Sequence, residues 1–133
     1  MRPEEQLHRA IVQLLQVYAN RGLLAFCHVP NGGRRSKVEA GVFKAMGTTP
    51  GVPDLLIWLP GGGHFQVELK AGNGRLSAHQ AAWVSRMTDM GVAVHVIRSL
   101  DGLEALLRAE GVPPVGTLDP AGAYRSGDCR RRS

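Results

Sequence analysis

Apolar side chains recur at helical spacing near the start of the chain. The residues of this set are Leu7, Ile11, Leu14, Leu15 and Tyr18. Spacings of three and four residues place side chains on one face of a helix, so this segment predicts an amphipathic helix. Pro3 and the two acids that follow it favour a helix start there, and Arg21-Gly22 favours its end.

Short apolar runs between glycine-rich breaks predict strands. Residues 23–29 form a largely apolar run closed by Pro30-Asn31-Gly32-Gly33, which predicts a buried strand. Residues 55–59 and 64–70 flank a Pro-Gly-Gly-Gly break, and the second run alternates polar with apolar side chains. This pattern predicts an antiparallel hairpin, and residues 92–98 predict a further strand.

Serine residues at capping positions predict the remaining helices. Ser36 and Glu39 have capping-box spacing before a helix over about 37–46. Ser77 and Ser99 precede two further segments with helical periodicity. The resulting order is helix, strand, helix, hairpin, helix, strand, helix. This order predicts an α/β fold with a four-stranded mixed sheet flanked by helices.

The predicted hairpin brings two acids together. The registers allowed by its short turn place Asp54 opposite either Glu68 or Leu69. The two carboxylates then approach to about 4.5–8 Å at Cβ. Carboxylates this close repel each other unless a cation lies between them. A hard divalent ion with oxygen ligands, Mg²⁺ or Mn²⁺, would remove this conflict and activate a water for attack on phosphorus.

A lysine accompanies these acids. Because side chains alternate along a strand, Lys70 lies on the same face as Glu68, where it would orient the water or neutralise developing charge. Each feature also has a purely structural explanation, since Pro53-Asp54 is a common strand start and Glu-x-Lys is usually a solvated ion pair. Their joint occurrence on facing strands favours a catalytic site.

Length and charge narrow the classes of protein to consider. The 133 residues support one domain, predicted over 1–112, and a flexible basic tail over 113–133 whose composition cannot bury a core. The net charge of +5 favours a polyanionic partner, although the tail supplies four of the sixteen basic residues. The sequence shows neither the pattern of a signal peptide nor a run of about 20 apolar residues that could form a transmembrane helix. We therefore expect a cytoplasmic protein of a bacterial or phage-infected cell, with no membrane partner.

Several ordered phrases of the chain match one known family. They are His28-Val29-Pro30-Asn31-Gly32-Gly33, Met46-Gly47-Thr48, Pro50-Gly51-Val52-Pro53-Asp54, Glu68-Leu69-Lys70, and Leu76-Ser77 with Gln80. On these residues the chain resembles the VRR-NUC (virus-type replication-repair nuclease) domain of the PD-(D/E)XK nuclease superfamily, over about residues 4–110. The resemblance implies a restriction-endonuclease-like core and metal-dependent hydrolysis of DNA.

The resemblance also implies roles for individual residues. The implied catalytic residues are Asp54, Glu68, Lys70 and Gln80. Among them, Lys70 positions the nucleophile and Gln80 lies beside the site on the following helix. The implied metal ligands are Glu5, Asp54, Glu68 and the carbonyl group of Leu69. Glu4, adjacent to Glu5, is the alternative for the first-helix acid.

Candidate DNA contacts surround the predicted helix over 37–46. They are Asn31, Gly32, Gly33, Arg34, Arg35, Lys37 and Thr48. Backbone amides and basic side chains near the capped helix start would hold a phosphate. Asn31-Gly32-Gly33 is equally well explained as a turn. His28 and His79 are explained either as phosphate contacts or as hydrogen-bonded polar residues.

The leading functional hypothesis is a Mg²⁺- or Mn²⁺-dependent endonuclease acting on DNA. The resemblance implies selectivity for branched DNA, including Holliday junctions, and action as a homodimer whose two sites address two strands. One alternative is a DNA-binding module without catalysis, which would gain nothing from two acids that face a phosphate backbone. Another is an assembly factor whose Arg-rich tail binds nucleic acid.

Overall fold

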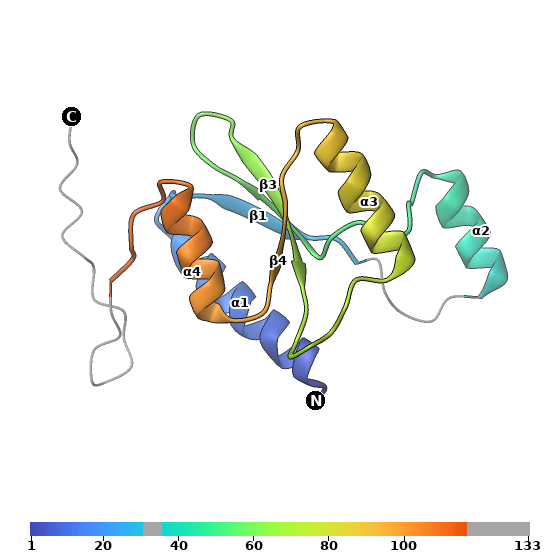
Figure 1. The fold of residues 1–133 in the computed structure, drawn as a ribbon, viewed down its shortest axis with the longest axis horizontal. Helices are drawn as coiled ribbons and strands as arrows, with labels where there is room; N and C mark the ends of the chain where they lie inside the picture. The colour runs from blue at the N-terminus through green and yellow to red at the C-terminus, as the bar shows by residue number, and fades with distance from the viewer. Residues whose placement is uncertain (31–35, 117–133) are drawn as a thin grey trace.

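The structure is a computed structural model that describes residues 1–30 and 36–116 (Figure 1). Its elements in chain order are α1 (Pro3–Asn20), β1 (Ala25–His28), α2 (Lys37–Ala45), β2 (Leu55–Trp58), β3 (His64–Leu69), α3 (Ala78–Asp89), β4 (Val94–Ile97) and α4 (Leu100–Ala109). The expected α/β fold with a four-stranded mixed sheet is confirmed in this part of the chain. None of the described helices has the length and apolar character needed to cross a membrane.

The strands lie in the order β1-β2-β3-β4. The pairs β1–β2 and β2–β3 are antiparallel, and β4 runs parallel to β3, to which α3 connects it. Leu59 N–H donates to the Gly63 carbonyl at 2.7 Å and closes the hairpin turn. Leu55 pairs with Val67, so the register continues to Asp54 opposite Glu68. This is the first of the two registers expected from the turn length.

Alternate residues of β3 serve the two faces of the sheet. Phe65, Val67 and Leu69 enter a core shared with α1 and α4, whereas Gln66 and Glu68 contact residues of α3. The buried core residues are Ile11, Leu14, Leu15, Tyr18, Leu24, Leu55, Ile57, Phe65, Val67, Leu69, Ile97, Leu103, Leu107, Val112 and Val115. Each large side chain removed from water contributes roughly 1.5–3 kcal/mol, so this core anchors the strands that carry the acids.

The prediction of a buried strand over 23–29 is wrong in both length and environment. β1 covers only Ala25–His28, and Phe26 is the one partly buried residue within it. The strand lies at an edge of the sheet and only its face toward α1 is covered. An apolar run predicts that a segment will pair in a sheet, but it does not reveal whether the segment lies at the edge.

α2 confirms the predicted helix over 37–46, and Ser36 Oγ accepts a hydrogen bond from Glu39 N–H at 3.1 Å. Figure 1 shows α2 projecting away from the sheet, and its backbone approaches no other described helix or strand. Val38, Val42 and Met46 are 77%, 53% and 79% exposed. An apolar helix face therefore points to solvent.

The chain after α4 returns to the core. Val112 and Val115 are 5% and 3% exposed and belong to the core cluster. The predicted boundary between residues 112 and 113 falls within this packed segment. Residues 117–133 of the predicted basic tail lie outside the described residues, so the division into domain and tail stays a prediction.

Candidate metal centre

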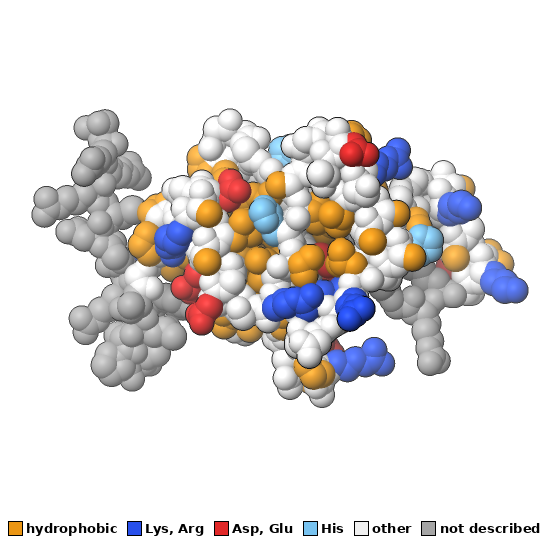
Figure 2. Space-filling view, viewed as in Figure 1, with side chains coloured by type: hydrophobic (Ala, Val, Ile, Leu, Met, Phe, Trp, Pro, Cys, Tyr) orange, Lys and Arg blue, Asp and Glu red, His pale blue; other side chains and the backbone are white. Residues whose placement is uncertain are grey.

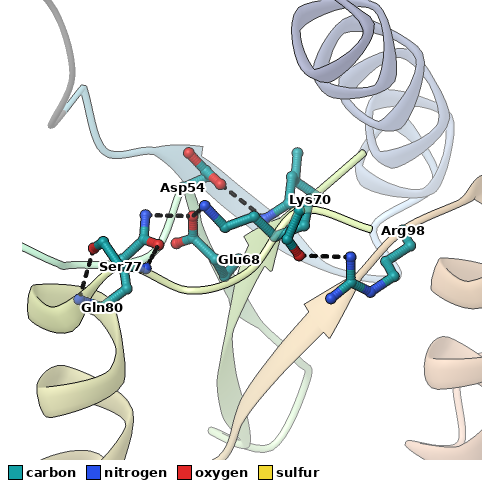
Figure 3. Close-up of polar contacts among 8 residues, drawn as sticks. Asp54, Glu68, Lys70, Ser77, Gln80 and Arg98 are labelled. Carbon is teal, nitrogen blue, oxygen red and sulfur yellow. Dashed lines mark hydrogen bonds and ion pairs between the residues drawn. The ribbon is translucent and has the colours of Figure 1, made fainter. Parts of the chain in front are cut away.

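Three carboxylates from separate parts of the chain converge in one cleft. Glu4 comes from the first turn of α1, Asp54 immediately precedes β2, and Glu68 belongs to β3. One oxygen from each of these acids lies within 4.8 Å of the others. The cleft has a volume of about 290 Å³, and the loop over 50–52 and the start of α3 complete its lining. Figure 3 shows Asp54 and Glu68 beside Lys70 at this place.

Glu68 is the most buried of the three acids, with 3% of its surface exposed. Gln80 Nε2 donates to Glu68 Oε1 at 3.0 Å, and Lys70 Nζ lies 3.9 Å from the same oxygen. The other oxygen, Oε2, is buried, and when the carboxylate is ionised it finds no hydrogen-bond donor among the described residues. An unpartnered buried oxygen is costly, so a proton or a cation is needed beside it.

The surroundings of Glu68 favour its protonated form. Its pKa is raised to about 8, first by burial, then by the charge of Asp54 and by the hydrogen bond that a protonated Glu68 donates to Asp54. The charge of Lys70 lowers the pKa but does not reverse the shift. Burial and Asp54 thus favour the protonated form of Glu68 when no cation is bound, and a divalent cation held there would compete with that proton.

Asp54 is held through its side chain and its backbone. Its Oδ2 accepts a hydrogen bond from Leu69 N–H at 2.8 Å. Its carbonyl accepts from Val29 N–H and from His28 Nδ1, each at 2.8 Å. Because a carbonyl can only accept, Nδ1 of His28 carries the proton. His28 thus orients Asp54 as a hydrogen-bonded polar residue, which is one of the two roles the sequence left open.

Gln80 belongs both to the cap of α3 and to the cleft. Its Oε1 accepts from Ser77 N–H at 2.9 Å, and Ser77 Oγ accepts from Gln80 N–H at 3.2 Å. These reciprocal bonds form a complete capping box. They fix the amide so that Nε2 is directed at Glu68, as Figure 3 shows. Local sequence indicates the cap, whereas the contact with Glu68 depends on the docking of α3 against β3.

Gly51 lets the loop before Asp54 approach α3. Its φ is +87°, and a Cβ atom at this position would overlap the His79 carbonyl and lie 2.9 Å from Gln80 N. Both the backbone conformation and the available space therefore require glycine. The glycine sets how closely Asp54 and the start of α3, the two sides of the cleft, can approach each other.

The donor atoms of the cleft fit a hard divalent cation. Glu4, Asp54 and Glu68 supply carboxylate oxygens, which Mg²⁺ and Mn²⁺ prefer to nitrogen or sulfur. The unpartnered oxygen of Glu68 is a further carboxylate oxygen that such an ion would satisfy. The residues present can therefore hold such an ion. The carbonyl of Leu69 as a further ligand stays a prediction.

Glu4, rather than Glu5, is the acid of α1 that reaches the cluster. Glu5 Oε1 lies 3.0 Å from Arg9 Nη2, one helical turn later, and the Glu5 side chain is half exposed. Neighbouring helix residues point about 100° apart, so the two acids cannot share one direction. Glu4, the alternative that the sequence left open, therefore lies in the cluster, and Glu5 does not.

The predicted DNA contacts are described only in part. The segment from Asn31 to Arg35 lies outside the described residues. Lys37 begins α2, and half-buried Thr48 follows that helix, with its N–H donating to the Phe43 carbonyl at 2.9 Å. Neither Lys37 nor Thr48 lines the cleft that holds the acids. The proposed DNA contacts of all seven residues stay predictions.

Comparison with known families places this cleft in context. The VRR-NUC domain model matches residues 2–101. The chain belongs to the VRR-NUC family. The matched range includes the residues of the candidate site described above, from Glu4 to Gln80. The α/β sheet is consistent with a restriction-endonuclease-like core. No curated protein and no solved structure gives a significant match to the chain. VRR-NUC is a nuclease family, and membership implies a hydrolase acting on DNA.

Two contributors to the site were not assigned their roles from sequence. His28 precedes Asp54 by 26 residues in the sequence, and Gly51 contacts the start of α3, which follows it by almost 30 residues. Both residues fall within the phrases that carry the family resemblance. Their presence there was the available signal, but only the tertiary contacts show what each does.

Proposed function

We propose that this VRR-NUC protein is a metal-dependent endonuclease that hydrolyses DNA phosphodiester bonds. The observation that carries the proposal is the convergence of Glu4, Asp54 and Glu68, with one oxygen of each within 4.8 Å of the others. The buried Oε2 of Glu68, which has no hydrogen-bond donor among the described residues, supports it. A protein that only bound DNA would be weakened by acids facing the phosphates. Membership of a nuclease family supports the same conclusion.

Glu4, Asp54 and Glu68 would hold the ion, Mg²⁺ or Mn²⁺. Such an ion, when bound, lowers the pKa of a water molecule and neutralises charge on phosphoryl oxygens. The protein supplies the fixed geometry. Leu69 N–H holds Asp54 Oδ2 in place, and Gln80 engages Oε1 of Glu68 and leaves Oε2 for the cation.

Lys70 is the proposed partner of the attacking water. Its Nζ lies 3.9 Å from Glu68 Oε1, and its side chain is 12% exposed, so solvent screens its charge only weakly. An ammonium here would orient the water and stabilise the extra negative charge that develops on the phosphoryl group. Because this charge is absent from the substrate, the interaction would favour the transition state.

Cleavage of labelled duplex, flap and four-way junction DNA tests the function. We expect wild-type protein to cut in Mg²⁺ or Mn²⁺ but not in EDTA, and Lys70→Ala and Glu68→Gln to be inactive. Glu104→Gln, which changes an exposed acid on α4, serves as the matched control and should cut normally. Binding without cutting in every metal would contradict the proposal and favour the non-catalytic DNA-binding module.

Within this function we propose selectivity for branched DNA and action as a two-fold homodimer. The exposed apolar face of α2 supports the dimer, because a helix of nine residues is marginal in water without tertiary contacts. Glu39 and Lys44 lie toward opposite ends of α2. In an antiparallel pair of these helices, each of the two charges would meet its opposite on the second copy.

Light scattering tests the dimer. Val42→Asp introduces a charge in the exposed face of α2 and should convert a wild-type dimer into a monomer. Met90→Asp is the control, since Met90 is also exposed, at 67%, but follows α3 rather than belonging to α2. A wild-type monomer at micromolar concentration would contradict the dimer and remove the support it lends to junction selectivity.

A further inference from the structure

Arg98, the residue after β4, holds the loop that follows β3. Its Nη1 donates hydrogen bonds to the carbonyl oxygens of Gly72 and Gly74, both at 2.8 Å. Figure 3 shows the guanidinium approaching from the side of Lys70 opposite Gln80. No described acid forms an ion pair with Arg98. The charged donor is therefore committed to the loop backbone, and such charge-assisted bonds are stronger than neutral ones.

The loop that Arg98 holds lies against Lys70. A Cβ atom built on Gly74 would lie 3.6 Å from Cδ and 3.8 Å from Cβ of Lys70, so the loop backbone borders the aliphatic stem. Lys70 N–H also donates to the Ile97 carbonyl at 3.1 Å, immediately before Arg98. Backbone pairing and the guanidinium thus position both the base and the stem of the lysine.

We propose that Arg98 is a positioning residue for DNA cleavage. It fixes the loop over 72–74 against the stem of Lys70 and so keeps the ammonium group beside Glu68. The proposal rests on the proposed nuclease function, because it concerns the residue assigned to the attacking water. It adds a residue from the end of β4, which touches neither the acids nor the reacting atoms.

The need for such a support follows from the chemistry of lysine. Its ammonium is a compact charge on a flexible four-carbon stem, so the side chain alone does not define where the charge lies. Electrostatic stabilisation of a transition state requires a charge already in place. A misplacement of about 1 Å can cost about 100-fold in rate. A loop that is itself held at two carbonyls restricts the stem without altering its charge.

A direct contact between Arg98 and a DNA phosphate is the competing explanation. Arg98 is exposed, and Figure 2 shows basic side chains gathered around the loop that follows β3. The two roles differ in measurable ways. A phosphate contact weakens DNA binding when it is removed and lowers the salt dependence of the affinity. A positioning role lowers the rate of the bound complex and leaves affinity unchanged.

Steady-state kinetics on the full chain separate the two roles. We expect Arg98→Ala to lower kcat about 10- to 100-fold while KM and the DNA Kd stay within about twofold of wild type. Arg86→Ala, which removes an exposed arginine from α3, controls for the lost charge and should leave kcat unchanged. An unchanged kcat, or a weaker Kd with a shallower salt dependence, would overturn the proposal.

Amide hydrogen exchange without DNA provides a readout independent of cleavage. Arg98→Ala should speed exchange over residues 70–76 and leave the protection of α1 and α4 at the wild-type level. Unchanged exchange over 70–76 would overturn the role of Arg98 even in an active nuclease. A wild-type protein that never cuts DNA would instead refute the nuclease function, and the exchange data would still show whether Arg98 orders the loop.

Discussion

Glu68 couples folding, protonation and cation binding in one side chain. The pKa of its carboxyl group is raised from 4.5 to about 8, chiefly by burial. Folding therefore takes up a proton between these two pH values. Because the folded state binds more protons than the unfolded state there, the free energy of unfolding falls as pH rises. This contribution to stability is complete below about pH 4.5 and is lost as pH passes about 8.

The metal-free protein should therefore become less stable toward alkaline pH. In EDTA, we expect the Tm of wild type to fall more steeply than that of Glu68→Gln between about pH 5 and pH 8.5, by at least several degrees. The variant carries an amide that cannot titrate. Calorimetry at several pH values measures the difference, and identical pH profiles would show that Glu68 is not buried with a raised pKa.

Gly51 provides a second prediction for a single residue. Gly51→Ala should lower the free energy of unfolding by roughly 1–2 kcal/mol through its positive φ, and further through the clash with the start of α3. Cleavage should also fall, because the clash separates Asp54 from Gln80. Denaturant unfolding and kcat measure the two effects.

Gly47→Ala is the matched control for this change. Gly47 also has a positive φ, of +96°, but an added Cβ there would meet nothing within 4 Å. It should show only the backbone cost and keep full activity. Equal effects from the two substitutions would contradict the role given to the Gly51 contact.

At the scale of elements, α3 combines a structural cap with one side of the cleft. Trp83 Nε1 donates to Gln66 Oε1 at 2.8 Å and docks the helix against β3. The capping box at its first turn then directs Gln80 at Glu68. Because Gln80 belongs to both the cap and the site, a change that weakens the cap of α3 should also lower the rate of cleavage.

Two serine caps of the same chemistry allow this link to be measured. Ser77 Oγ accepts from Gln80 N at 3.2 Å, and Ser99 Oγ accepts from Gly102 N at 3.0 Å. Ser77→Ala and Ser99→Ala should each cost about 1 kcal/mol of stability. Only Ser77→Ala should also lower kcat, since its cap orients Gln80. Equal kcat values for the two variants would show that the cap of α3 does not serve the site.

At the scale of the whole molecule, folding concentrates negative charge. Asp54 and Glu68 meet across the β2–β3 hairpin, whereas Glu4, which is distant in sequence, joins them because α1 packs against the sheet. The apolar core provides the free energy that holds these acids together, against the repulsion that acts when Glu68 is ionised. A cation bound among these acids should relieve their repulsion and so raise the free energy of unfolding.

Divalent metal should therefore raise the Tm of wild-type protein. An ion present at 100 times its Kd stabilises the folded state by about 2.7 kcal/mol. We expect Mg²⁺ or Mn²⁺ to raise the Tm, EDTA to reverse the change, and Asp54→Asn to abolish it, while Glu104→Gln behaves as wild type. A wild-type Tm that no divalent ion alters would contradict a metal site among these acids.

Much of the fold could be predicted from local pattern. Helical periodicity and serine caps indicated α1, α2, α3 and α4, and β2 and β3 begin where the hairpin pattern placed them. Turn length narrowed the hairpin to two registers, with Asp54 opposite Glu68 or Leu69, and the structure has the first of them. The helices and the starts of these strands depend on neighbours in sequence, so the sequence by itself determined them.

Long-range contacts decided the rest. The edge position of β1 and the exposure of α2 depend on which surfaces other elements cover. Which of the two acids, Glu4 or Glu5, reaches the cluster depends on the rotation of α1 about its axis. Two neighbouring acids in the sequence do not reveal that rotation. Arg98 meets Gly74 only because β4 lies parallel to β3. Periodicity specifies which face of an element is apolar, whereas packing between elements determines which polar side chains meet.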